Sequence, residues 1–166
     1  MAAMILGMSL ARFTQVHVAI SLIGIAAGFI IIFGMMARKR LPLMTALFLL
    51  TTILTSVTGF LFPYHGRTPG IVIGCVSLVV LLLAMIALYG GHLRGGWRGT
   101  WVVTAVVAQF FNFLVLVVQS FEKVPALHAL APTGKEMPFK VAQILTLLVF
   151  VVLGVLAFRK FRVEEE

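Results

Sequence analysis

The chain has a single cysteine, Cys75, and this scarcity removes several classes of protein from consideration. One thiol cannot form an intramolecular disulfide, a CxxC redox motif or a cysteine-rich metal site. We expect Cys75, which stands inside an apolar run, to be a small buried apolar residue. The sequence also lacks a P-loop, an HExxH or GxSxG motif, a nucleotide-binding glycine motif and an acidic metal pair. A self-contained hydrolase or an ATP-driven pump is therefore disfavoured, and enzymatic activity is left open.

Charged residues are scarce as well, at 11% of the chain, whereas 61% of the residues are hydrophobic and the mean hydropathy is +1.14. Such a composition excludes a soluble domain. Most hydrophobic residues fall in runs of about 20 residues, the length that a helix needs to cross a bilayer. The runs cover residues 15–36, 43–62, 70–89, 101–121 and 139–158. They are continuously apolar, without the alternation of a membrane strand, so the sequence predicts an all-α transmembrane bundle of five helices and a single domain over residues 1–166.

The formal net charge of +8 indicates how the helices are threaded, and we do not read it as a nucleic-acid-binding signal. With five crossings, one side of the membrane receives eight basic residues: Arg38, Lys39, Arg40, Arg94, Arg98, Arg159, Lys160 and Arg162. The other side receives five: Arg12, Arg67, Lys123, Lys135 and Lys140. The positive-inside rule makes the first side cytoplasmic. We therefore expect the N-terminus outside, the C-terminus inside and the lipid bilayer as the main partner.

The link of residues 122–138 is long for a turn and still partly apolar, with prolines at 125, 132 and 138. Pro125 is suited to open a short helix, because proline is tolerated at a first helical position. We expect an outer re-entrant or interfacial link that lies over the mouth of the bundle.

Helices in lipid contact one another through small and polar side chains, so these residues mark the inward faces. The predicted polar interior contains Asn112, Gln109, Thr52, Thr55 and Ser56. Asn112 and Gln109 fall near mid-membrane, where they either tie helices together or line a path for a small solute. No acidic residue lies within a run, which argues against a carboxylate relay for protons or sodium. A transport or channel component is kept as an alternative function.

The predicted outer side gathers three of the four histidines and two glutamines: His17, Gln119, Gln143, His65 and His128. Polar or ionisable groups at membrane depth are costly and so indicate function. A haem or metal at the outer rim would use His17 with His65 or His128. A quinone would suit an apolar slot headed by His17, Gln119 and Gln143. We expect an outward-facing pocket for haem b or quinone in an accessory or electron-transfer subunit.

Glycine pairs at GxxxG spacing offer a third interpretation. Gly24 with Gly28, and Gly70 with Gly74, are spaced for close approach of another helix. They are consistent with a structural subunit that docks other subunits of a membrane complex, or a second copy of itself.

Two stretches resemble small, uncharacterised bacterial multi-pass inner-membrane proteins. They are TALFLLTTILTSVTGFLFPYHG, residues 45–66, and VVQSFEKVPALHALAPTGKEMPF, residues 117–139. The resemblance implies a helical membrane fold and location in the bacterial inner membrane, and it implies no activity. In general plan the chain is also similar to small cytochrome b-like membrane subunits, although it lacks their paired helical histidines.

Overall fold

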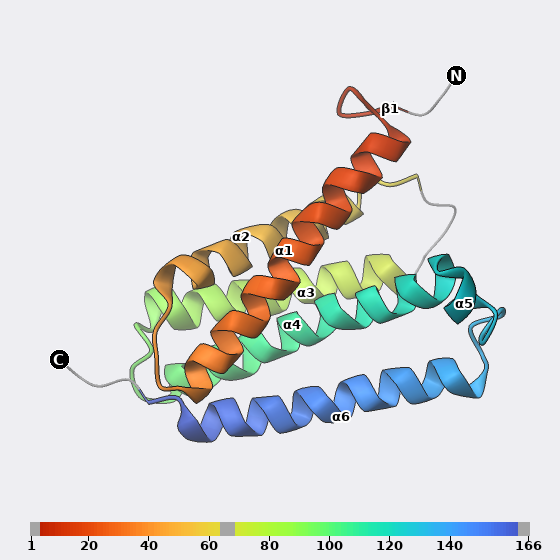
Figure 1. Ribbon diagram of the computed structural model, residues 1–166. Helices are drawn as coiled ribbons and strands as arrows, with labels where there is room; N and C mark the ends of the chain where they lie inside the picture. The colour runs from red at the N-terminus through yellow and green to blue at the C-terminus, as the bar shows by residue number, and fades with distance from the viewer. Residues whose placement is uncertain (1–3, 64–68, 163–166) are drawn as a thin grey trace.

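Five long helices dominate the structure, a computed structural model that describes residues 4–63 and 69–162 (Figure 1). They are α1 (Leu10–Met36), α2 (Pro42–Gly59), α3 (Pro69–Met85), α4 (Gly96–Lys123) and α6 (Met137–Lys160). A π-helix, η1 (Ile86–Gly90), continues α3, and the short helix α5 (Pro125–His128) lies between α4 and α6. All five, α3 taken together with η1, are long and apolar enough to cross a membrane. The prediction of an all-α multi-pass membrane protein is confirmed.

A small hairpin precedes α1 and was not predicted. Strand β1 (Met4–Ile5) pairs with β2 (Met8–Ser9) in antiparallel register. The two residues between them, Leu6 and Gly7, have φ angles of 51° and 76°. Positive φ at both positions suits the twist of a two-residue hairpin turn, but leucine is an unusual residue there, so the sequence carries no clear turn signal. The side chain of Ser9 then caps α1 by accepting a hydrogen bond from the Arg12 amide.

The helices form a closed ring in the order α1, α2, α3, α4, α6, with α6 returning to α1. Helix α4 also packs against α1 across this ring, and Figure 1 shows α4 in the middle of the bundle. The N-terminal hairpin and the C-terminal end of α6 lie at opposite ends, as an odd number of crossings requires. The links 37–41 and 91–95 and the end of α6 meet at one end, called here the basic end; the hairpin and α5 mark the opposite end.

The contact between α4 and α1 is organised by Gln109, whose side chain is fully buried. Its Nε2 donates to the backbone carbonyl of Ile25 at 2.8 Å. Its Oε1 is pressed against Gly28, and a methyl group added to that glycine would overlap the carboxamide. Oε1 has no hydrogen-bond partner among the described residues. The absence of a side chain at Gly28 is therefore what lets a glutamine fit between two helices in the middle of the bundle.

Helix α2 is tied to the same centre through its threonines. Asn112 Nδ2 donates to Thr52 Oγ1 at 3.0 Å, and Thr52 is fully buried. Gly24 of α1 faces Thr51, whose Oγ1 would lie 3.0 Å from an added methyl group. Ser56 donates to the carbonyl of Thr52 in its own helix at 3.0 Å. The polar residues predicted for the interior of α2 and α4 thus lie where these helices meet each other and α1.

Two expectations from the sequence are wrong. Cys75 is exposed on a face of α3 that no other helix covers. The neighbouring helices cover the face that carries Ser77. Gly24 and Gly28 do not offer a free docking face, since both are buried against α2 and α4 of the same chain. Gly74 likewise faces the ring of Phe60, 3.0 Å from where a methyl group would stand. These glycines therefore allow helices of the same chain to pack closely against one another.

The turn before α6 is organised by Glu136. Its carboxylate accepts hydrogen bonds from the hydroxyl of Thr133 at 2.7 Å, from the Thr133 amide at 3.1 Å and from the Lys135 amide at 2.9 Å. The bond from the Thr133 hydroxyl, with help from the backbone amides, lowers the pKa of Glu136 to about 2. The charged carboxylate thereby fixes the entry into α6.

The Gly28 contact predicts the effect of a single methyl group. Gly28→Ala should lower the unfolding free energy in detergent by about 1–3 kcal/mol, the usual cost of overpacking, because moving Gln109 breaks its bond to Ile25. Gly96→Ala is the matched control, since nothing lies within 4 Å of a methyl group there. Adding Gln109→Ala should make the double variant less destabilised than the sum of the two single ones. Equal stability of Gly28→Ala and Gly96→Ala would contradict this packing.

The Glu136 turn predicts a local dependence on acid. Because its folded pKa is depressed, the carboxylate stabilises the turn above its ordinary pKa of 4.5, and this stabilisation is lost as the pH falls towards about 2. Hydrogen exchange of the amides of Thr133 and Lys135 should therefore quicken, beyond its intrinsic pH dependence, over that interval. In Glu136→Gln the protection should be weaker at neutral pH and should not change across the same interval.

Candidate functional site: a cavity at the basic end

At the end of the bundle marked by the hairpin and α5, opposite the basic end, His17 makes contacts between α1 and α2. Its Nδ1 lies 2.7 Å from Thr58 Oγ1, and its ring meets that of Phe62 edge to face with centroids 5.1 Å apart. Ser21 donates to the His17 carbonyl one turn along α1. The His17 side chain is half-buried. His17 therefore links α1 to α2. Its hydrogen bond uses Nδ1, and none of the described hydrogen bonds uses Nε2.

The other predicted members of the outer cluster are not joined to His17. Gln119 donates to Glu122 Oε2 of its own helix at 2.9 Å. Gln143 is half-buried in the second turn of α6, and His128 is exposed at the end of α5. His65 lies outside the described residues, as do Tyr64 and Arg67. Within residues 4–63 and 69–162, no group of three or more His, Cys, Asp or Glu side chains could hold a metal ion.

The predicted polar interior serves packing in this structure. Gln109 and Asn112 bond to α1 and α2, and Ser56 bonds to its own helix. Thr55 Oγ1 is buried without a hydrogen-bond partner among the described residues. Of the two roles that the sequence left open for Asn112 and Gln109, these bonds favour the tie between helices over a solute path.

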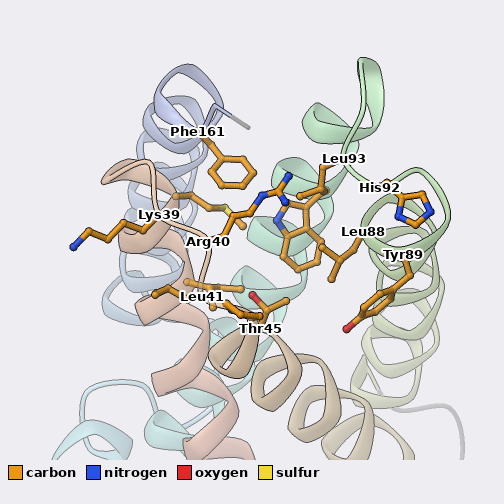
Figure 2. A pocket seen from close by; sticks show the side chains of 13 residues that line it. Lys39, Arg40, Leu41, Thr45, Leu88, Tyr89, His92, Leu93 and Phe161 are labelled. Carbon is orange, nitrogen blue, oxygen red and sulfur yellow. The ribbon is translucent and has the colours of Figure 1, made fainter. Parts of the chain in front are cut away.

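A cavity of about 280 Å³ opens at the basic end, where the sequence analysis placed no site (Figure 2). It is bounded by the ends of the helices and by two links. Its lining consists of Ile31, Met35, Lys39, Arg40, Leu41, Pro42, Thr45, Leu88, Tyr89, His92, Leu93, Trp101 and Phe161. Apolar side chains from the helices thus meet cationic and hydroxyl-bearing side chains from the links and helix ends in one hollow.

Unusual backbone shapes this cavity. Leu88 and Tyr89 lie in η1, where the wider π-helical turn ends the third membrane-spanning helix; such turns are rare and are frequent at functional sites. His92 and Leu93 follow with φ angles of 49° and 59°, and Arg38 in the other link has 59°. Non-glycine residues pay for the left-handed region in conformational energy, and such strain clusters at binding sites. Here it turns Leu93 inward, where it is buried, while His92 stays exposed at the rim.

The cations of the basic end differ in what they contact. Arg98 makes structural contacts. Its Nη1 donates hydrogen bonds to the backbone carbonyls of Phe158 at 3.0 Å and Phe161 at 2.6 Å, at the end of α6. Its guanidinium also lies over the Phe158 ring, 5.2 Å from the centroid. Arg40 instead lines the cavity, and Figure 2 shows its side chain reaching across the view towards Leu93. The Lys39 side chain extends away from the group.

No acidic side chain offsets these cations within the described part of the chain. The glutamates there are Glu122 and Glu136, and both lie at the opposite end. Among residues 4–63 and 69–162, the basic side chains of this end are therefore not balanced by acidic ones, which favours anions around the cavity mouth. Their cluster is visible in the sequence, where it indicates only the topology of the chain.

No family model matches this chain, and neither a curated protein nor a solved structure is significantly similar to it.

Proposed function

We propose that this protein binds an anionic amphiphile at the basic end, with the charged headgroup at the rim of the cavity and the apolar part against the helices. The lining of the cavity carries the proposal. Arg40, Thr45 and Tyr89 supply charge and hydrogen-bond donors, and side chains such as Ile31 and Leu88 supply an apolar wall. A ligand with both characters satisfies both parts of the lining.

The size of the cavity supports a headgroup-sized ligand. Its volume of about 280 Å³ lies just below the ~300–1,000 Å³ usual for drug-sized ligands. A porphyrin needs a larger enclosed space, so this cavity does not favour haem. Haem b or quinone at the opposite end, and solute transport past Asn112, stay predictions from the sequence alone.

The charge distribution also supports an orientation. Eight of the thirteen basic residues stand at the basic end, and we propose that this end faces the cytoplasm, with the N-terminal hairpin outside, in the inner membrane of a bacterium. In that orientation the cavity opens towards the leaflet whose anionic lipids attract basic surfaces. The proposed ligand would then be drawn from the surrounding bilayer.

The binding proposal is tested by filling the cavity. Purified protein in zwitterionic micelles should form adducts with phosphatidate or oleate, but none with phosphatidylcholine beyond background, in native mass spectrometry. Thr45→Phe should weaken binding of the anionic amphiphiles at least about tenfold, because the ring occupies the cavity. Thr100→Phe is the control, since Thr100 lies on α4 at the same end but does not line the cavity. Unchanged binding by Thr45→Phe would place the lipid elsewhere and refute the proposal.

The orientation is tested with reporter cysteines in a Cys75→Ser background. In intact spheroplasts, a membrane-impermeant maleimide should label Lys135→Cys, because that turn lies at the proposed outer end. Arg94→Cys, in the link after η1, should be labelled only after the membrane is permeabilised. The reverse pattern would place the basic end outside.

A further inference from the structure

A groove of about 220 Å³ lies on the outside of the bundle, between α4 and α6, and its lining residues are all Val, Leu, Phe or Gly. The side chains of Val106 and Phe150 are buried there, whereas those of Val103 and Val151 are exposed. None of its lining residues belongs to the basic-end cavity, so this site is independent of the proposed function. We infer that the groove holds one acyl chain of an anionic phospholipid from the surrounding bilayer.

The dimensions of the groove suit a single hydrocarbon chain. Its lining extends from Val103 to Phe110 on α4 and from Leu147 to Val155 on α6, which is roughly 10–12 Å along the helices. A volume of about 220 Å³ over that length gives a mean cross-section of roughly 20 Å². A helix with its side chains is about 10 Å wide or more, so its cross-section is roughly four times larger. An acyl chain therefore fits within the groove, whereas a partner helix does not.

The chemistry of the lining also favours an acyl chain over a helix. Helices associate in lipid through small residues and polar ties, but five of the nine lining residues are valines, and Gly154 is the single small one. The branched side chain of valine has few rotamers, so the groove keeps its shape without an occupant. If no chain entered the groove, the atoms along it would lose their van der Waals contacts. A flexible hydrocarbon chain restores these contacts without any polar group.

Positive charge at the basic end of the groove favours an anionic lipid. One turn beyond the groove, α4 and α6 touch: a methyl group added to Gly99 would lie 2.9 Å from the Phe158 ring. The guanidinium of Arg98 lies over the same ring, and none of the described hydrogen bonds uses its Nη2 or Nε. Arg159 is exposed beside Phe158 in the sequence. A negatively charged headgroup attracted to these two cations places its acyl chain at the entrance of the groove.

The inference is tested by locating the chain with a photoactivatable lipid. The full-length protein in zwitterionic micelles is mixed with subsaturating phosphatidylglycerol that carries a diazirine in one acyl chain. After illumination and digestion, mass spectrometry identifies the labelled residues. Label should appear on the facing segments 103–110 of α4 and 147–155 of α6. Val151→Phe should reduce this labelling about tenfold, because the ring occupies the groove.

Val152→Phe is the matched control. Val152 is the next residue on α6, it is exposed to a similar degree, 57% against 53% for Val151, and it does not line the groove. This variant should leave the labelling unchanged. Thr45→Phe, which fills the basic-end cavity, should also leave it unchanged, so failure of the proposed function is distinguished from failure of this inference. Thermal unfolding of each variant verifies that it is folded.

Three results would overturn the inference. Equal labelling of Val151→Phe and Val152→Phe would place the chain elsewhere on the surface. Equal labelling by phosphatidylcholine with the same diazirine would show that Arg98 and Arg159 do not select an anionic lipid. A dimer of the wild-type protein that Val151→Phe abolishes and Val152→Phe preserves, detected by chemical cross-linking, would assign the groove to a second copy of the chain.

Discussion

The architecture depends on one buried carboxamide. Gln109 sits between α4 and α1 with its amide on the Ile25 carbonyl and its oxygen against Gly28. In a bilayer, apolar side chains gain little by leaving lipid for protein, so helices associate through close packing and polar ties. Gly28 permits the close approach and Gln109 supplies the tie. Asn112, one turn further along α4, extends the same link to Thr52 of α2, and three helices are thereby held at one level of the bundle.

The two ends of the bundle differ in how closely their side chains pack. At the opposite end, the contacts of His17 with Thr58 and Phe62 continue the seam between α1 and α2, so the histidine acts in packing. At the basic end, the helices finish in the π-turn η1 and in links with left-handed residues, and their side chains do not fill the space between them. The cavity of about 280 Å³ lies where the cations are concentrated. The function proposed for it follows from this coincidence of volume and charge.

The basic end also shows how one cluster of charge can serve two purposes. Arg98 donates hydrogen bonds to two backbone carbonyls at the C-terminal end of α6. Arg40 makes no such contact and lines the cavity. Residues of the same type and in the same region therefore differ in their contacts, and Arg40 is the one that the proposed function uses.

The sequence by itself determined the helices, their number and their inward faces, because a bilayer demands long apolar segments and admits polar groups only where protein meets protein. It also marked Gln109, Asn112 and Thr52 as interior. It could not decide which partner each of these residues takes: Gly28 lies against Gln109 of the same chain, and the ring of His17 lies beside Thr58. The position of the cavity was decided by the tertiary structure alone. It lies where η1, two links and the ends of several helices come together, and no local pattern of residues in the sequence predicts how these elements meet.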